Sequence, residues 1–496
     1  MQNAPPFTLR LRPAKWHDWR LRLARYGLFC AFLAWGPGCS SSNAGGAPGG
    51  AGGADGGVAD SATSDGSGGE GSGELRHEIS VKASDGMATD EFGEAVALSG
   101  DGNTLAVGAR HHEAPDGTHV GKLYVYSRAG GVWTEELKLE GTKLAATGIG
   151  ESVALSGNGN TLAVSAPNTP IPGAVFVLSR TPQGWGTALP VMSLAASSGV
   201  RVALSGNGDV LVVVSPQDPT DGQGNPDPNG AATTTYYVFR RQGAAWTQEA
   251  ALRPFGVGIT SGGAIALSRD GHTLAVSRAN AVALLTDSGS QWTKIRELST
   301  SNPSPSGGFG ASLALSADGG VLAVGAPGET PGGAAFLFQR DANWSEVGRL
   351  QASNPAVDAQ FGAQLVLADD GNFLVVSAPK DNSAGAGING DQTKSQLNYP
   401  LYSTGAAYLF RRTSSGDAWT QETFLKSPAA HFGCRPGEVA CFNGAFGTSV
   451  ACSSSGKTLA VGDPLDSSPS KGPVLLEAVP QDNSAAYSGA VQIFGH

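Results

Sequence analysis

The sequence is poor in charged and aromatic residues, which make up only 15% and 7% of its 496 residues. Methionine and cysteine are also rare, at 3 and 5 residues. Runs of Glu, Lys and Leu that would indicate helices are few, whereas Val, Thr and glycine-containing turn signals occur throughout. The scarcity of helical patterns and the abundance of turns, with 72 glycines, predict an all-β protein.

A basic surface is also missing. The formal net charge is −10, and six of the Lys and Arg residues fall within the first 38 residues, so the rest of the chain is more acidic still. An acidic protein without a basic patch repels phosphate backbones, and we therefore expect no nucleic-acid partner.

Several catalytic and cofactor motifs are absent or lack their context. Neither His-Glu-x-x-His nor Gly-x-Ser-x-Gly occurs. Gly385-x-Gly387-x-x-Gly390 matches the dinucleotide fingerprint, but no helical pattern follows it, so we interpret it as a glycine-rich insertion. The stretch His111–Glu113, with His119 nearby, offers metal ligands, but adjacent side chains on an extended chain point in opposite directions. It is interpreted as an exposed polar loop, and we predict no catalytic, cofactor-binding or metal-binding residue.

The N-terminus has the pattern of an export signal. A basic segment, 10–25, precedes a short apolar segment, 27–35, which is too short to span a bilayer as a permanent helix. Small residues before Cys39 and a serine run after it resemble a bacterial lipoprotein signal, in which this cysteine is lipidated. An ordinary cleaved signal is the alternative. We predict a signal peptide at 1–38 and a Gly/Ser/Ala-rich disordered tether at 39–73.

The remaining chain, 74–496, consists of near-copies of the unit at 309–344. Each copy has a first strand, a turn ending in glycine, and second and third strands. First strands are expected near Val96, Val153, Val202, Ile265, Leu313, Leu365 and Val450. Fourth strands are expected to begin at Trp133, Trp185, Trp246, Trp292, Trp344 and Trp419. The seventh copy lacks a fourth strand.

One strand remains to complete the seventh copy. Residues 75–82 form a strand pattern before the first copy and have no other assignment. Pairing it with the last third strand, 490–494, closes the array and removes the edges that an open array would expose. We therefore predict a seven-bladed β-propeller of four-stranded antiparallel blades, closed by an N-terminal strand.

The Phe-Gly pairs at 92–93, 309–310, 361–362 and 446–447, with Gly-Ala-Pro at 325–327, resemble FG-GAP repeats of integrin α-chain-like propellers. In calcium-binding members of that family, the turn between the first two strands carries several carboxylates. Here Asp101 matches the last of them, but Ala97 and Ser99 stand in place of the earlier ones. Because Ca²⁺ needs six to eight oxygen ligands, these turns are interpreted as plain hairpins and no cofactor is predicted.

Two cysteines lie close together in the sequence. Cys434 and Cys441 are separated by six residues in one loop of a protein that we expect to be exported. We predict a disulfide between them, worth roughly 2.5 kcal/mol from the loop-entropy relation. Cys452 occupies a strand position where other copies have leucine, and is interpreted as a buried apolar residue.

Loop length varies most on one face. The loop between the second and third strands is short in blade five (328–333) but long in blade six (380–405) and blade seven (465–489). The connection 427–445 and the blade-one loop 110–121 fall in the same sector. Long loops on a rigid scaffold are frequent binding sites. The predicted binding face comprises Tyr399, Tyr402, His431, Arg435, Phe442 and Tyr487.

Three functions remain open at this point. The first is a non-enzymatic, monomeric propeller of the outer membrane or cell surface, anchored only by its lipid, that binds protein or carbohydrate; a secreted form is the alternative location. The second is a polysaccharide lyase or hydrolase that uses the central funnel, although the first strands carry only Arg201 as a notable charge. The third is a purely structural envelope protein.

Overall fold

The computed structural model describes most of the chain from Glu74 onwards, within a compact unit that extends from Ser72 to His496. The described residues are 74–167, 174–192, 200–223, 225, 232–260, 263–289, 291–300, 304, 306–383, 385–390, 404–428, 445–475 and 487–496. Among them, no helix is long and apolar enough to cross a membrane.

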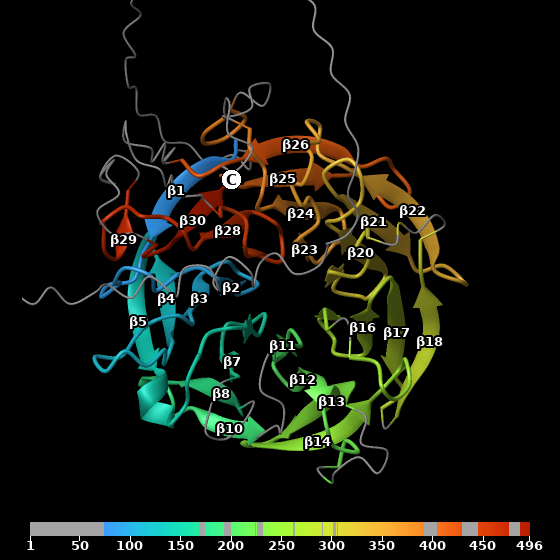
Figure 1. Ribbon diagram of the computed structural model, residues 1–496, viewed down its shortest axis with the longest axis horizontal. Helices are drawn as coiled ribbons and strands as arrows, with labels where there is room; N and C mark the ends of the chain where they lie inside the picture. The colour runs from blue at the N-terminus through green and yellow to red at the C-terminus, as the bar shows by residue number, and fades with distance from the viewer. Residues whose placement is uncertain are drawn as a thin grey trace, which may run out of the picture. The chain divides into compact units, whose positions relative to one another are not determined.

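Seven antiparallel sheets are arranged in a ring around a central axis (Figure 1), as the repeats predict. Each sheet is one blade, and in blades one to six the strands follow one another in chain order from the axis outwards. Blades one to three comprise β2 (Ala95–Leu98), β3 (Thr104–Ala109), β4 (Lys122–Ala129) and β5 (Val132–Glu140); β6 (Val153–Leu155), β7 (Thr161–Ala166), β8 (Ala174–Thr181) and β10 (Leu189–Met192); and β11 (Arg201–Leu204), β12 (Val210–Asp218), β13 (Thr233–Gln242) and β14 (Ala245–Leu252).

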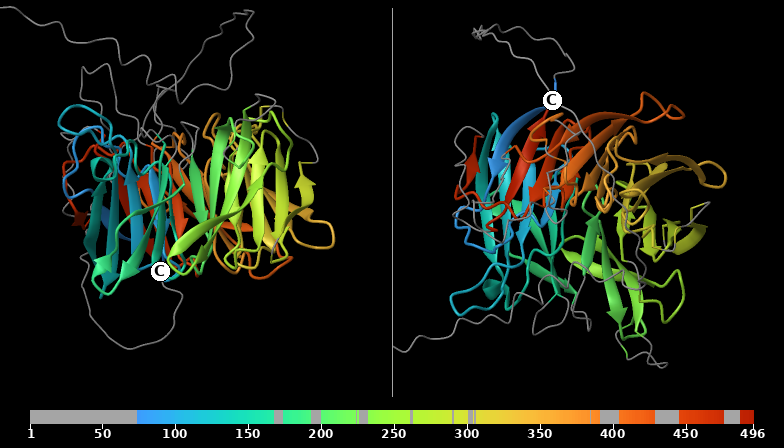
Figure 2. Two further views of the ribbon diagram at one scale, coloured as in Figure 1. Left: turned by 90° about the horizontal axis from the view of Figure 1, so that it is seen from below. Right: turned by 45° about the horizontal axis from the view of Figure 1, so that its top comes forward.

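Blades four to six repeat this order, and in blade seven the N-terminal strand takes the fourth position. They comprise β15 (Ile265–Leu267), β16 (Thr273–Arg278), β17 (Ala281–Asp287) and β18 (Trp292–Leu298); β19 (Ser312–Leu315), β20 (Val321–Ala326), β21 (Ala334–Gln339) and β22 (Ser345–Leu350); β23 (Leu365–Leu367), β24 (Phe373–Ala378), β25 (Ala406–Arg411) and β26 (Thr420–Leu425); and β27 (Val450–Cys452), β28 (Thr458–Asp463), β30 (Ala490–Gly495) and β1 (Arg76–Val81). Figure 2 shows these blades from the side, with their strands running roughly along the ring axis.

The N-terminal strand closes the ring, and this prediction is confirmed. β1 pairs antiparallel with β30, with Ile79 opposite Ile493 and Val81 opposite Val491. A short fifth strand that the sequence did not reveal, β29 (Pro473–Val474), pairs with the outer edge of β1. Blade seven is therefore assembled from the two ends of the propeller sequence.

The fourth strand of blade two begins later than predicted. Trp185 lies in a separate two-residue strand, β9 (Gly184–Trp185), and the main strand β10 starts only at Leu189. Both pair with β8, so the chain leaves the sheet after Trp185 and returns to it. The tryptophan still marks the outer strand, where Arg180 lies over its ring at 5.1 Å. A four-residue 3₁₀ helix, Gly141–Leu144, follows β5.

The apolar core is divided into seven clusters among the described residues, each joining two neighbouring blades. The Phe of the Phe-Gly pair lies in this layer: Phe92 is buried, with its ring centroid 5.2 Å from that of Tyr124. Phe361 packs in the same way against Tyr408, at 5.4 Å. These edge-to-face contacts explain the aromatic residue in the four copies that carry a Phe-Gly pair.

Gly489 requires glycine because two backbones meet there. It pairs with Phe92 of the next blade, has φ of 83°, and a Cβ would lie 2.1 Å from the Phe92 carbonyl oxygen.

We expect Gly489→Ala to lower the free energy of unfolding by about 3 kcal/mol, from left-handed backbone strain plus overpacking. Gly117→Ala is the matched control, since Gly117 has the same φ of 83° with nothing within 4 Å. It should cost only about 1 kcal/mol. Equal losses in urea unfolding would contradict the close approach.

Candidate functional site

One end of the central channel is closed by backbone hydrogen bonds between the blades. The turn between the first and second strands of each blade donates one hydrogen bond to the next blade, 2.8 to 3.1 Å long. We call this end the turn face. The ring runs through Gly100, Gly157, Gly206, Arg269, Ala317, Asp369 and Ser454, and back to Gly100.

Arg269 fills the axis at the turn face. Its guanidinium lies 2.5 Å from Asp369 and also donates to Ser454, both on the far side of the ring. A Cβ on Gly157 would lie 2.3 Å from this guanidinium, which explains the small residues on the facing blades. The cavity lined by this ring is about 150 Å³. A second depression of about 650 Å³ on the turn face is lined by residues that include Arg269, Asp270 and Asp318.

Asp101 and Asp318 are engaged within their own turns, unlike Asp369, which contacts Arg269. Asp101 accepts hydrogen bonds from the Ser99 hydroxyl and from the backbone and side chain of Asn103. Desolvation raises the pKa of Asp101, but these hydrogen bonds outweigh it and the pKa is lowered overall. The same Ser-x-Asp arrangement recurs at Ser316 and Asp318. These contacts stabilise the turns.

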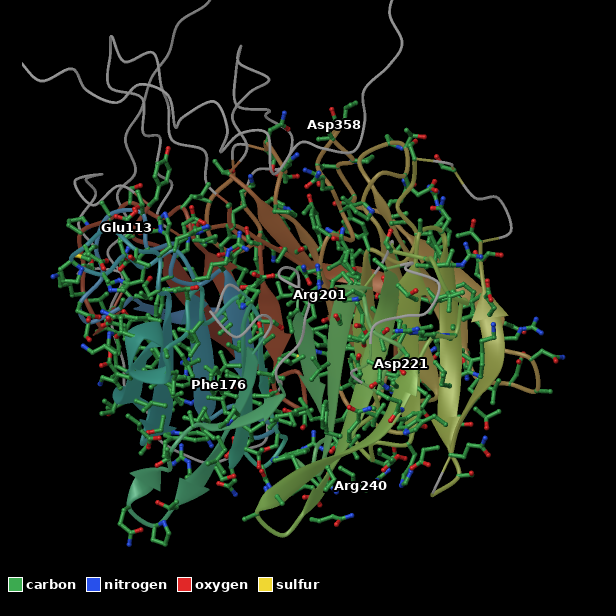
Figure 3. The ribbon with its side chains drawn as sticks, turned by 60° about the horizontal axis from the view of Figure 1, so that its bottom comes forward. Glu113, Phe176, Arg201, Asp221, Arg240 and Asp358 are labelled. Carbon is green, nitrogen blue, oxygen red and sulfur yellow. The ribbon has the colours of Figure 1, made fainter. Side chains whose placement is uncertain are left out.

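The opposite end, the loop face, carries the connections between second and third strands and between blades. Among the described first strands, Arg201 is the only charged residue, and Figure 3 shows it towards the centre of the ring. Its side chain is exposed to solvent yet closely surrounded by protein. This desolvation lowers the pKa of Arg201, against the attraction of Glu151.

The long loops of blades six and seven start and end at buried ion pairs. In blade six, Lys426 lies 2.9 Å from Asp381, and their side chains are 2% and 0% exposed. In blade seven, Lys82 forms the corresponding pair with Asp466, and both side chains are 2% exposed. The lysine follows the fourth strand and the aspartate follows the second strand in both blades. We call these pairs the loop anchors.

Each anchor also fixes the far end of its loop. The Asp381 carbonyl accepts hydrogen bonds from the backbone of Thr404 and Gly405, each 3.0 Å long. The Asp466 carbonyl accepts one from Gly489, 2.9 Å long. Blade three has a related arrangement, with Arg253 located 3.5 Å from Asp218. The insertions therefore leave and re-enter the propeller at fixed points.

Asp85, beside blade one, is also paired with lysines: it lies 2.9 Å from Lys122 and 3.2 Å from Lys138. Desolvation raises the pKa of Asp85, but hydrogen bonds from Lys122 and Tyr124 outweigh it and hold the pKa well below its usual range. A lowered pKa in the folded state means that this stabilisation is full above the ordinary pKa of about 4 and is lost as the pH falls below it.

We therefore expect Asp85→Asn to be most destabilising at neutral pH. The difference in urea midpoint between the variant and the parent protein should shrink as the pH falls from about 4 towards 2, because Asp85 of the unfolded parent then takes up a proton, which favours unfolding. A difference that stays constant across this range would contradict the ion-pair explanation.

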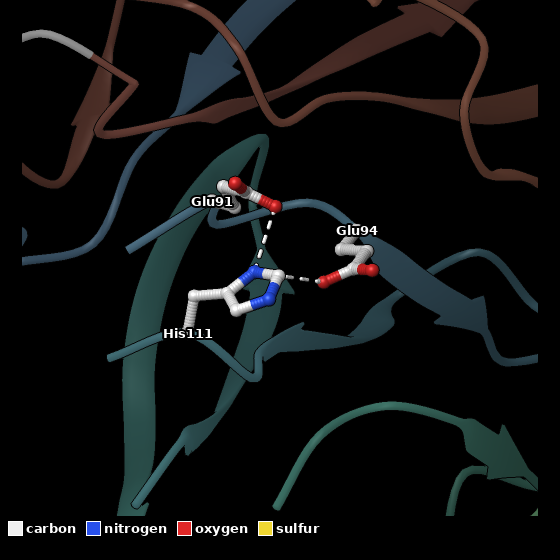
Figure 4. A group of neighbouring side chains, drawn as sticks. All are labelled: Glu91, Glu94 and His111. Carbon is white, nitrogen blue, oxygen red and sulfur yellow. Dashed lines mark hydrogen bonds and ion pairs between the residues drawn. The ribbon is translucent and has the colours of Figure 1, made fainter. Parts of the chain in front are cut away.

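Blade one carries a second charged group on the loop face, which we call the Glu91 cluster: Glu91, Glu94 and His111. Figure 4 shows the His111 ring between the two carboxylates. His111 Nδ1 lies 2.7 Å from Glu91 Oε2 and 3.7 Å from Glu94 Oε2. Arg110 Nε contacts the other oxygen of Glu94 at 2.8 Å. Burial raises the pKa of Glu94, against the attraction of Arg110 and His111.

Sequence reasoning did not find this cluster, because its members come from two loops. Glu91 and Glu94 precede β2, whereas His111 follows β3. The interpretation of His111–Glu113 as an exposed loop is also wrong for His112, which is only 4% exposed and contacts Asp90 at 3.0 Å. The two adjacent side chains do point in different directions, as expected for an extended chain: His111 contacts Glu91 and Glu94, whereas His112 contacts Asp90.

Of the predicted binding-face residues, only Tyr487 is described. Its carbonyl accepts a hydrogen bond from the Glu91 backbone, which joins blade seven to blade one beside the Glu91 cluster. Burial raises the pKa of Tyr487, and the charge of Glu91 adds to this effect. The other binding-face residues lie outside the described residues: Tyr399, Tyr402, His431, Arg435 and Phe442. The same holds for Cys39, Cys434 and Cys441.

Cys452 is partly exposed and not fully buried as predicted. It packs against the cluster between blades six and seven and also lines the small cavity at the turn face. Desolvation raises the pKa of its thiol to about 12, which suppresses the reactive thiolate at neutral pH.

Comparison with solved structures gives matches of low sequence identity. The periplasmic gluconolactonase of Pseudomonas aeruginosa is 15% identical, with 71% of this chain and 97% of that chain covered and a TM-score of 0.45. A chain of the mitotic checkpoint complex is 16% identical over 78% and 91% of the two chains, with a TM-score of 0.47. A Lactobacillus plantarum protein is 14% identical over 68% and 85%, with a TM-score of 0.46. No function follows from these likenesses.

Sequence comparison gives a more specific result for one part of the chain. The search of curated proteins gave no match. The family model of the FG-GAP repeat matches residues 76–126, which extend from the closing strand β1 into the third strand of blade one. The chain is thus a seven-bladed β-propeller that carries an FG-GAP repeat at residues 76–126.

Proposed function

We propose that the protein is a non-enzymatic binding propeller of the cell envelope, which presents the loops of blades six, seven and one to a protein or carbohydrate partner. In this proposal, lipidated Cys39 anchors it to the outer membrane or cell surface and the glycine-rich segment 39–73 serves as tether.

The loop anchors are the observation that carries this proposal. Burying a lysine and a carboxylate is costly unless they pair, so a buried ion pair at the base of a loop is weak evidence for stability alone. The buried ion pair is better explained by its position, because it fixes the point at which the loop leaves the propeller. The pairs Lys426–Asp381 and Lys82–Asp466 do this for the two longest insertions of the loop face.

The ring end opposite these loops supports the same assignment. Arg269 and the backbone ring close the turn face, and no metal-ligand group of three residues other than the Glu91 cluster occurs in the described part of the chain. The described first strands carry Arg201 but no carboxylate or histidine that would act with it as an acid or base. A binding role therefore has more support than polysaccharide cleavage in the funnel.

The test is a capture experiment with three baits. The first is the full chain. In the second, loops 380–405 and 465–489 are shortened to the six-residue length of 328–333, with Asp381, Asp466, Lys82 and Lys426 kept. The third, a matched control, has only the blade-three loop 217–232 shortened. Each bait is incubated with envelope extract and surrounding glycans, and the captured material is treated with protease or periodate to identify its class.

A partner held by the first and third baits but lost by the second would support the proposal. Loss only with the third bait would assign binding to blade three. Equal recovery by all three would exclude these loops, and turnover by the full chain on a polysaccharide panel would replace the binding function with an enzymatic one.

A further inference from the structure

We propose that Glu91, Glu94 and His111 form a binding site for a divalent first-row transition metal, with Zn²⁺ as the best-suited ion. The three ligand atoms lie within 4.8 Å of one another. This inference does not depend on the proposed partner-binding function.

The geometry fits such an ion. Ligand atoms about 2.1 Å from a tetrahedral Zn²⁺ lie about 3.4 Å apart. The separations of His111 Nδ1 from the two carboxylate oxygens, 2.7 and 3.7 Å, bracket this value. One imidazole and two carboxylates suit Zn²⁺ and its neighbours but do not provide the six to eight oxygens that Ca²⁺ takes.

The state of Glu94 also points to a cation. Its side chain is 14% exposed, and its Oε2 atom is buried without any hydrogen-bond partner. A buried carboxylate oxygen without a partner is unfavourable by the full cost of its lost hydration. This same oxygen faces His111, so a metal held between them would supply the missing interaction.

The surrounding residues hold the three ligands in place. Arg110 contacts Oε1 of Glu94 at 2.8 Å and therefore leaves Oε2 available, and it also contacts Glu151 at 3.4 Å. Glu91 is fixed through its backbone by Tyr487 of blade seven. Such outer contacts orient metal ligands and tune their affinity.

Charge balance favours a divalent ion. Glu91, Glu94 and Glu151 contribute three negative charges, and Arg110 is the one permanently positive side chain within ion-pair distance of them in the described part of the chain. Bound metal would replace the contact between His111 Nδ1 and Glu91 Oε2. Three protein ligands would leave one coordination position for water.

The same positions in the other blades do not carry this set. In blade six, the positions of Glu91, Glu94 and His111 are occupied by Gln360, Ala363 and Lys380. Blade five has Gly308, Ala311 and Gly328 there. The arrangement is therefore a feature of blade one and not a consequence of the repeat.

The experiment uses the full-length, unreduced protein after removal of metal with a chelator. We expect one Zn²⁺ per chain by elemental analysis and calorimetry. His111→Asn, Glu91→Gln and Glu94→Gln should each weaken Zn²⁺ affinity at least tenfold. Glu113→Gln is the matched control, since Glu113 lies two residues from His111 but contacts His119. It should leave the affinity unchanged. Circular dichroism checks that each variant is folded.

Substitution with Co²⁺ distinguishes this site from the cysteines. Nitrogen and oxygen ligands give Co²⁺ only weak visible bands, whereas thiolates add an intense charge-transfer absorption. Weak bands that disappear in His111→Asn would support the site. Thiolate absorption, unchanged Zn²⁺ affinity in folded His111→Asn, or no affinity tighter than millimolar would overturn it. His111 lies in a loop, so this variant remains informative even if Glu94→Gln fails to fold.

Discussion

Deleting residues 74–84 from the full-length chain is expected to abolish folding or to lower the melting temperature by more than 10 °C. The deletion removes β1, whose Val81 is fully buried, and leaves β30 as an exposed strand edge. It also leaves Asp466 buried without Lys82, and loss of one partner from a buried pair costs about 3–5 kcal/mol. Natural domains have only about 5–15 kcal/mol of stability, so the combined loss should exceed it.

Near-UV circular dichroism during heating measures this effect. Deleting eleven residues from the tether, 50–60, is the control and should leave the melting temperature unchanged. Adding a peptide of residues 74–84 should restore part of the signal, because the vacant edge of β30 can pair with it. A deletion variant that melts within about 3 °C of the parent would show that β1 does not close the ring.

Lys426→Met should lower the free energy of unfolding by about 3–5 kcal/mol, because Asp381 stays buried without its counter-charge. The carboxylate would retain hydrogen bonds from Tyr408 and Ser383, so the protein should still fold. Adding Asp381→Asn should recover part of the loss, which reveals coupling between the two residues. Urea unfolding gives these values.

Lys380→Met is the control for this prediction. Lys380 is exposed and directly precedes Asp381, so its substitution should change the stability by no more than about 0.5 kcal/mol. Additive losses from Lys426→Met and Asp381→Asn would contradict the loop anchor, as would a Lys426→Met variant as stable as the Lys380→Met control.

The repeats made the fold predictable. Apolar runs around Asp318-Gly319 and its counterparts define hairpins locally, and the surplus strand at 75–82 leaves the tail of blade seven as its natural partner. Local patterns were less informative where the chain deviates from the repeat. Two such deviations are the break in the outer strand between Trp185 and Leu189 and the added strand β29. Both depend on contacts between a non-repeated segment and the edge of its sheet, which a local pattern does not encode.

The candidate sites were harder to predict because they depend on residues far apart in sequence. Lys82 and Asp466 meet only because the N-terminal strand joins the last blade. A signal for the loop anchors was nevertheless present, since a basic residue follows the fourth strand in the same blades in which an aspartate begins a long loop. For the Glu91 cluster, the two glutamates precede His111 by about twenty positions, and only the adjacent strands β2 and β3 bring them together.

Hydrogen exchange of the β1 amides tests the central claim, that an N-terminal strand closes the ring and brings the loops of blades seven and one together. If the ring is closed, the β1 amides that pair with β30, between Arg76 and Val81, should exchange as slowly as those of β28 and β30, because they open only when the whole propeller unfolds. Exchange within seconds, at the rate of an unstructured segment, would show that the ring is open and would contradict the account.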